Sequence, residues 1–361
     1  MGRKLNGLYR EFIFHPGETL KEILEDREMS QRELAIRTDV TETHVSNIVN
    51  CKKPISVAYA KKLEYALDID ASFWINIQAN YDKELADFEE TNNISSQELK
   101  ILKKLTDITE YLKEKGFLEP EANGATLVIQ LRKLLGISSL LRIPEISQSG
   151  AYRLATTTKV DPYVLFTWLR MCDLMIEKQT VEQKLEIEML KRKIPIFKEL
   201  MFKDEGQIKK DLELHLADCG IKFSIIKHFR GAPIQGVIKR NSDGTLSLVM
   251  TNRHKFADIF WFTLLHEIGH IVNGDIKDKL IDYDFVDNKT EDRANSFASD
   301  SLIDASKYKE YIKRGDFSMP SIREFCISQN IPTFILIGRL QREKYLEYSQ
   351  YSDEKVKYEM Y

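Results

Sequence analysis

The 361-residue sequence has few cysteines, few glycines and prolines, and no long apolar run. Its four cysteines stand far apart without a C-x-x-C pair, which is typical neither of a disulfide framework nor of a thiolate zinc site. No segment approaches the roughly 18 consecutive apolar residues of a membrane-spanning helix. Residues 1–16 lack the apolar core of a signal peptide. We therefore expect a cytoplasmic protein without membrane attachment, and the 16 glycines and nine prolines exclude fibrous classes.

An excess of positive charge is also absent. The 53 Lys and Arg residues against 56 Asp and Glu give a net charge of −3, so the chain as a whole is not a polycation that binds nucleic acid through charge alone. Hydrophobic residues make up 43% and charged residues 30%, which is sufficient for ordinary buried cores. At about 100–200 residues per domain, the length predicts two or three folded units.

Hydrophobic periodicity predicts a mainly α, multidomain protein with three regions. Helical spacing dominates from Pro16 to about residue 219, with a polar break at Thr91-Asn92-Asn93 that we interpret as a linker. Alternation then predicts strands over 221–226, 234–239 and 246–250, the last two joined as a hairpin. The expected regions are a helix-turn-helix bundle at 1–88, a helical middle at 95–204, and an α+β domain at 205–361.

His266-Glu267-Ile268-Gly269-His270 is the motif with the clearest chemistry. Residues four apart share a helix face, so both imidazoles can bind one Zn²⁺ ion. Glu267 lies one step round the helix, where it can act as general base on zinc-bound water. With only seven histidines in the chain, a chance match is rare. Two buried core histidines beside a surface glutamate are the alternative without a metal.

A catalytic zinc site needs a third protein ligand and one open position. Glu291 is the best candidate, near the start of a helix that Thr290 can cap. Asp275 and Asp278 are alternatives in a loop, whereas Asp292 points elsewhere on the helix of Glu291. A peptidase also needs a group that stabilises the developing oxyanion. Candidates that flank the motif and can donate a hydrogen bond are Arg253, His254 and Tyr283.

The segments D-I-F-W-F-T-L-L-H-E-I-G-H-I at 258–271 and E-D-R-A-N-S-F-A-S-D-S-L-I at 291–303 resemble the ImmA/IrrE family of zinc metallopeptidases. The resemblance covers roughly residues 205–345. It implies a zincin-like fold, a bound zinc ion, and Glu291 as the third ligand beside His266 and His270. It also implies Glu267 as the catalytic base of an endopeptidase that cleaves a regulatory protein.

The N-terminal region has the spacing of a helix-turn-helix. Ser30 and Glu33 form a capping box for the second helix, and Asp39 occupies the turn, where a left-handed conformation is expected. Thr41 can cap the third helix, whose outer face would contact DNA bases. Lys52 and Lys53 would contact phosphates. The remaining predicted DNA contacts are Gln31, Thr41, Thr43, His44, Ser46 and Asn47.

Four segments are similar to HigA-type antitoxins of the XRE helix-turn-helix superfamily: H-P-G-E-T-L at 15–20, S-Q-R-E-L-A at 30–35, S-F-W at 72–74 and N-I-Q-A-N-Y-D at 76–82. Two departures are Asp39 and Cys51, each at a position where glycine is usual. Residues 1–80 hold 11 basic and 12 acidic residues, so one copy would bind DNA weakly and a homodimer is expected. A protein-docking role for this module is the alternative.

Together these patterns predict a DNA-binding regulator fused to a zinc-dependent endopeptidase, acting in transcription or toxin–antitoxin control. Its expected partners are a DNA operator and a protein substrate, either a repressor or a toxin partner. The alternative is a non-enzymatic antitoxin and autorepressor in which zinc has a structural role. A third reading is a phage-type repressor controlled by triggered proteolysis. Glu267 favours the enzyme, because a structural zinc site needs no base.

Overall fold

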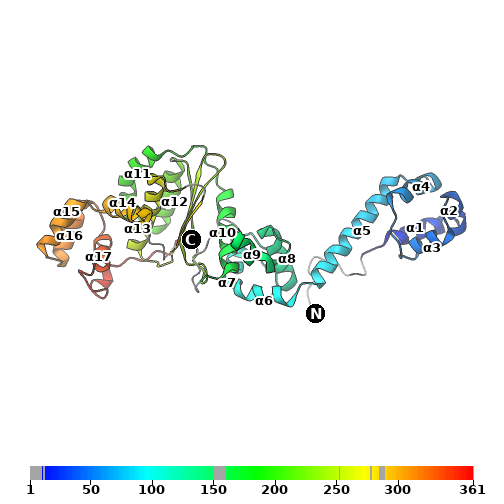
Figure 1. Cartoon of the computed structure of the whole chain (residues 1–361), viewed down its shortest axis with the longest axis horizontal. Helices are drawn as coiled ribbons and strands as arrows, with labels where there is room; N and C mark the ends of the chain where they lie inside the picture. Colours follow the sequence, from blue (N-terminus) through cyan, green and yellow to red (C-terminus); the bar gives the residue numbers. More distant parts are fainter. Residues whose placement is uncertain are drawn as a thin grey trace. The chain divides into compact units, whose positions relative to one another are not determined.

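The computed structural model describes residues 10, 13–149, 160–251, 253–276, 279–283 and 289–360. Within these ranges the chain is mostly helical, as predicted, with one four-stranded sheet (Figure 1). Contacts divide the chain into two compact units, Met1–Lys103 with Leu118–Ser138, and Lys104–Phe117 with Ser139–Tyr361. The helical region expected over 95–204 is thus shared between the two units.

The first unit begins with a five-helix bundle around Trp74, Leu34, Ile48 and Leu63, which are fully buried. Side chains cap these helices: Ser30, for example, accepts a hydrogen bond from the amide of Glu33 at 3.1 Å. The reciprocal half of that predicted capping box is replaced, because the Glu33 carboxylate bonds to Arg37 instead. The helices are α1 (Pro16–Asp26), α2 (Gln31–Arg37), α3 (Glu42–Val49), α4 (Val57–Leu67) and α5 (Ala71–Asn92).

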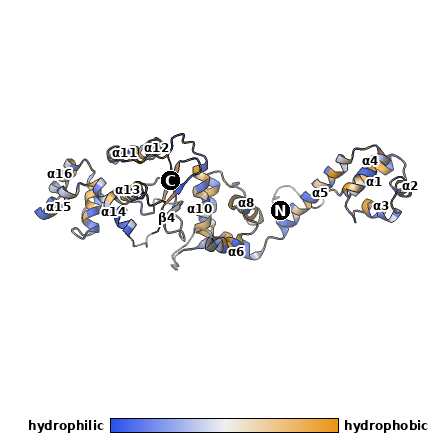
Figure 2. Cartoon of the chain, turned by 45° about the horizontal axis from the view of Figure 1, so that its top comes forward, coloured by the Kyte–Doolittle hydropathy of each residue, from blue (hydrophilic) through white to orange (hydrophobic). Residues whose placement is uncertain are grey.

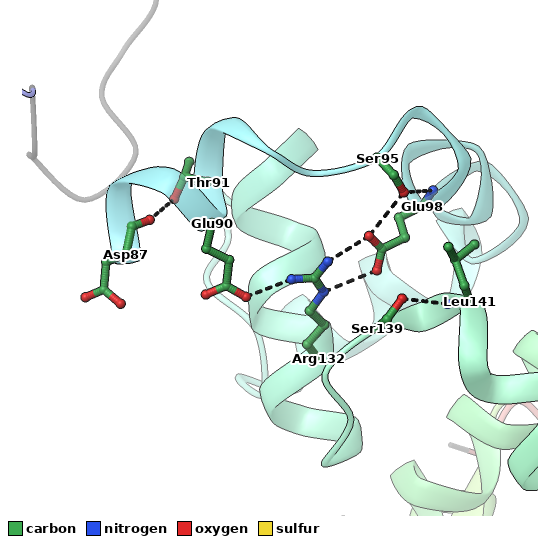
Figure 3. Close-up of polar contacts among 8 residues, drawn as sticks. All are labelled: Asp87, Glu90, Thr91, Ser95, Glu98, Arg132, Ser139 and Leu141. Atoms are coloured by element: carbon green, nitrogen blue, oxygen red, sulfur yellow. Dashed lines mark hydrogen bonds and ion pairs between the residues drawn. The ribbon is translucent and has the colours of Figure 1, made fainter. Parts of the chain in front are cut away.

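A buried ion pair joins the next helices of this unit. Arg132 of α8 (Gly124–Leu135) donates to both carboxylate oxygens of Glu98 in α6 (Ser96–Lys104), at 3.2 and 2.7 Å, and to Glu90 of α5 at 2.7 Å (Figure 3). The side chain of Glu98 is only 3% exposed. Removing one partner of such a pair typically costs about 3–5 kcal/mol, since the other charge stays buried. The cluster therefore fixes α8 against the end of α5.

Hydrophobic and hydrophilic residues share the surfaces of α5 and α10 (Pro162–Glu177), as expected for helices that bury one face (Figure 2). Among the residues that the structure describes, no single helix is long and apolar enough to cross a membrane. One bent pair, Gly124–Leu135 with Leu140–Ile146, passes the same test by length and composition alone.

The second unit contains the sheet, in the order β1-β3-β2-β4. The predicted hairpin is confirmed: β2 and β3 are antiparallel, with Val237 opposite Val249. Strand β1 pairs in parallel with β3, and β4 pairs with the other edge of β2; neither pairing was predicted. Because β2 has a neighbour on each side, its backbone is held in place. The strands are β1 (Ile221–Ile226), β2 (Ile234–Arg240), β3 (Leu246–Thr251) and β4 (Lys279–Tyr283).

Helix α13 (Ala257–Asn273) is the central helix of this unit. Its own apolar residues, such as Trp261, Leu264 and Ile268, lie on several sides of the helix and are fully buried, which is the pattern of a buried helix. It ends at Gly274, whose φ of +73° suits glycine. The other helices are α7 (Thr106–Glu114), α9 (Ile143–Ser149), α11 (Ile187–Leu200), α12 (Glu205–Ala217), α14 (Lys289–Leu302), α15 (Ala305–Arg314), α16 (Met319–Gln329), α17 (Thr333–Arg342) and two 3₁₀ turns, Leu140–Arg142 and Ser352–Glu354.

Candidate functional site

The structure brings together the three predicted zinc ligands. His266 and His270 lie one turn apart on α13, with their Nε2 atoms 3.0 Å apart. Glu291, in the first turn of α14, places its Oε2 3.1 Å from Nε2 of His266 and its Oε1 3.5 Å from Nε2 of His270. Ligand atoms about 2.0–2.2 Å from a tetrahedral zinc ion stand roughly 3.4 Å from one another. The three donor atoms therefore fit around one ion with little rearrangement.

Small residues allow α14 to approach α13 closely enough to place Glu291. A Cβ on Gly269 would lie 3.1 Å from Cα of Ala294 and 3.2 Å from Cβ of Phe297, tighter than most contacts of real Cβ atoms. Ala294 itself is fully buried at this crossing. The glycine inside the H-E-x-x-H motif is thus a packing residue, which its place in the motif did not reveal.

Each histidine has an acceptor on its other ring nitrogen. Nδ1 of His266 lies 3.1 Å from Oδ1 of Asn295, and Nδ1 of His270 lies 3.1 Å from Oδ2 of Asp275. An acceptor at Nδ1 holds the proton there and leaves Nε2 free to bind a metal. Arg293 pairs with Asp275 in turn. Of the two alternatives to Glu291, Asp275 therefore lies behind the candidate ligand His270, and Asp278 lies outside the described residues. Asp292 is exposed.

The site favours a cation. Burial would raise the pKa of Glu291, but hydrogen bonds from His266 and His270 outweigh it and lower that pKa to about 2. Burial would lower the pKa of His270, yet Glu291 and Asp275 raise it. Both shifts come from the contacts between the carboxylates and the imidazoles, in which each group stabilises the charged form of its partner. A divalent ion bound between the three side chains would replace the proton as the compensating positive charge.

Glu267, the predicted base, is fully buried on the side of α13 that faces β2. A Cβ on Gly236 would lie 2.0 Å from Oε1 and 2.5 Å from Cδ of Glu267. Only glycine at position 236 leaves room for this carboxylate. Sequence reasoning missed Gly236, because its role depends on the packing of β2 against α13 rather than on any local pattern.

A cavity of ≈ 720 Å³ opens from the candidate metal ligands His266 and Glu291 toward α17. His254, one of the three oxyanion candidates, lines it together with His266 and Glu291, whereas Arg253 is not among its lining residues. Burial, and next the neighbouring Arg253, lower the pKa of His254 and favour its neutral form. The side chain of the third candidate, Tyr283, lies outside the described residues. An extended molecule in the cavity can therefore reach the candidate metal-binding side chains from one side.

The helix-turn-helix has the predicted turn. Asp39, between α2 and α3, takes the left-handed conformation with φ of 49°, and Cys51 does so after α3 with φ of 58°. Both occupy positions where glycine was expected. Two predicted DNA contacts also have structural roles, because Thr41 caps α3 and the His44 ring packs on Tyr59 at 4.9 Å. All eight predicted contacts remain at least partly exposed: Gln31, Thr41, Thr43, His44, Ser46, Asn47, Lys52 and Lys53.

The comparisons with known proteins concern the helix-turn-helix region of the first unit. Residues 20–74 match the helix-turn-helix family model. The virulence-associated protein A' of Dichelobacter nodosus is 39% identical over 69 residues, which are 19% of this chain and 60% of that protein. The chain thus spans about 60% of the length of this relative.

Two solved antitoxin structures are also similar to the chain. An addiction module antidote protein of a HigA family from Coxiella burnetii has a TM-score of 0.20 at 22% identity, covering 31% of this chain and 96% of its own. The Pseudomonas aeruginosa antitoxin HigA with the higBA promoter has a TM-score of 0.19 at 26% identity, covering 30% and 98%. The assignment of a helix-turn-helix domain to residues 20–74 rests on the family model.

Proposed function

We propose that this chain is a DNA-binding regulator whose second unit is a zinc-dependent, zincin-like endopeptidase. The observation that supports the enzyme best is the joint placement of His266, His270 and Glu291, with a cavity that reaches His266 and Glu291. Within the described ranges, the cluster contains three ligands and no fourth His, Cys, Asp or Glu. Three ligands with an open position are typical of catalytic zinc, whereas structural zinc takes four.

When bound, zinc would lower the pKa of water to about 7 and polarise the scissile carbonyl. The remaining chemistry belongs to the chain. Glu267 takes a proton at its carboxylate as water attacks the carbonyl carbon, and then gives it to the leaving amine nitrogen as the C–N bond breaks. His254 is the oxyanion candidate in the same cavity, where its imidazole N–H can donate to the carbonyl oxygen.

The enzyme is tested with a zinc-loaded full chain and internally quenched degenerate peptides. Wild type should hydrolyse some of them, and Glu267→Gln should lose hydrolysis while keeping its zinc, because an amide cannot accept the proton. Glu310→Gln, on the exposed surface of α15, is the matched control and should behave as wild type. If the wild type cleaves neither these peptides nor any product of a neighbouring gene, the non-enzymatic antitoxin is the better account.

The first unit is proposed to bind an operator as a homodimer. The match of residues 20–74 to the helix-turn-helix model supports this, together with the exposed positions of Lys52 and Lys53 and the partly exposed Asn47. Half-sites about 34–36 Å apart would then follow from the dimer. A toxin–antitoxin or repressor setting, in which the protein substrate is a regulatory partner, is part of the same proposal.

A mobility-shift assay on the DNA upstream of the gene tests this. Asn47→Ala should relax preference at one base pair per half-site, since a bidentate contact gives about 1–3 kcal/mol of discrimination. Lys53→Ala should weaken binding to all sequences and reduce its salt dependence. Lys83→Ala is the control, because Lys83 pairs with Asp87 on α5. No retardation at low salt and micromolar protein would favour a protein-docking role.

A further inference from the structure

One wall of the cavity places a cation beside the metal ligands. The guanidinium carbon of Arg342, at the end of α17, lies 4.5 Å from the centre of the Phe262 ring. Phe262 in turn lies one helical turn from His266, with 6.3 Å between their ring centres. All three residues line the cavity. The ring attracts the guanidinium group without using its N–H donors as a carboxylate would, so these donors can bind a ligand.

A second cation lines the same cavity. The Lys355 ammonium lies 4.8 Å from the ring centre of Phe256 and 5.7 Å from that of Tyr348. Its side chain is half-buried, in contrast to the exposed Arg342. Two aromatic rings thus position this ammonium, just as Phe262 positions the guanidinium of Arg342. Both cations are held by aromatic rings rather than by acids.

The acidic groups of the cavity are engaged elsewhere. Glu291 contacts the two histidines, and Glu343 accepts hydrogen bonds from Arg339 and from the hydroxyl of Tyr308. Asp258 is largely buried at the start of α13, and burial raises its pKa although Lys355 opposes the shift. In the part of the chain that the structure describes, neither Arg342 nor Lys355 has a carboxylate oxygen within 4.0 Å. With a divalent ion at the metal site, the cavity has an excess of positive charge.

We propose that this cavity selects polypeptide substrates with acidic side chains close to the scissile bond, whose carboxylates bind Arg342 and Lys355. This inference rests on the proposed peptidase function, because it names the substrate class of the same site. Guanidinium groups bind carboxylates through two parallel N–H···O bonds, and the exposed edge of Arg342 is suited to that geometry. Arg342 and Lys355 are specificity residues, and they take no part in the reaction itself.

The test measures peptide binding rather than cleavage. The probes are two fluorescent degenerate decapeptide pools, one with Asp or Glu at fixed positions and the other with Asn or Gln there. Zinc-treated, full-length Glu267→Gln protein should bind the acidic pool about tenfold more tightly than the neutral one. Adding Arg342→Ala and Lys355→Ala should abolish the difference. Adding Lys313→Ala and Arg314→Ala, two exposed cations of α15 outside the cavity, should preserve it.

Charge reversal separates a lost contact from a lost fold. Arg342→Glu should reverse part of the preference, so that a third pool with Lys at the fixed positions binds better than the acidic pool. Equal binding of the acidic and neutral pools, or a preference that survives the double alanine variant, overturns the inference. Hydrolysis by the wild-type protein is scored separately. Cleavage without acidic preference refutes only the specificity, whereas acidic preference without cleavage refutes only the peptidase.

Discussion

Gly236→Ala is the substitution that tests the active-site geometry most sharply. The added Cβ would lie 2.0 Å from Oε1 and 3.1 Å from Cγ of Glu267, so one of the two groups must move. Strand β2 pairs with β3 on one side and with β4 on the other, and it cannot retreat without breaking a ladder. The Glu267 carboxylate is therefore the group that moves, by about 1 Å or more to reach ordinary van der Waals contact.

The magnitude follows from that displacement. A misplacement of about 1 Å in a reacting group can cost on the order of a hundredfold in rate. Full removal of a general base costs about 10²–10⁴-fold, so the alanine variant should fall toward the lower end of that range. Inserting a methyl group into a packed site also costs roughly 1–3 kcal/mol of stability. The metal ligands themselves are not touched, so zinc content should be unchanged.

The assay compares kcat on the quenched peptide pool, zinc content and thermal unfolding for wild type and Gly236→Ala. Gly206→Ala is the matched control, since a Cβ at Gly206 of α12 would meet only Asp204 at 3.5 Å. We expect kcat to fall about a hundredfold for Gly236→Ala and to stay unchanged for Gly206→Ala. A Gly236→Ala enzyme with normal kcat would refute the argument that this glycine makes room for the base.

Two further predictions concern groups around the site. Asp275→Asn should weaken zinc binding about 10–100-fold, as loss of a carboxylate behind a ligating histidine typically does. Competition with a chelator measures the zinc affinity, with Asp292→Asn as the control. Burial, and next the charges of Arg253 and His254, lower the pKa of His228 from 6.5 to about 4. Between pH 6.5 and pH 4 the unfolded chain therefore binds the proton of His228 more strongly than the folded chain does. Stability of the second unit should therefore decline as pH falls from 6.5 toward 4, and His228→Gln should flatten that decline in urea titrations; an unchanged slope would contradict it.

The cluster of the three candidate metal ligands was predictable because its geometry is local or nearly so. His266 and His270 needed only helical spacing, which fixes two imidazoles on one face whatever the surrounding fold. Glu291 was named from a resemblance and a capping pattern, and it was one of several candidates by spacing alone. The hairpin was likewise predictable from alternation around Asn241-Ser242-Asp243-Gly244, and Gly244 takes the expected turn conformation with φ of +85°.

The remainder of the site depends on contacts between distant segments. In the sequence, Gly236 is only a residue that disfavours a strand, and its role appears when β2 is packed against α13. Likewise, no local pattern shows that Asn295 of α14 contacts His266. Strand β4 was not predicted, and it pairs with the edge of β2 that the hairpin leaves open. Ser95 accepts a hydrogen bond from the Glu98 amide within the same helix end, but the Glu98 carboxylate also pairs with Arg132 from a later helix. No local pattern contains that partner.

Metal stoichiometry tests the central claim most directly. Elemental analysis of purified full-length protein should find about one zinc ion per chain in the wild type, and the same in Glu267→Gln and in the neighbouring control Asp292→Ala. The zinc content should fall well below one in His266→Ala, His270→Ala and Glu291→Ala, each with unfolding monitored in parallel. A wild type that binds no zinc, or full zinc retained by a folded Glu291→Ala variant, would contradict the metal centre proposed for this protein.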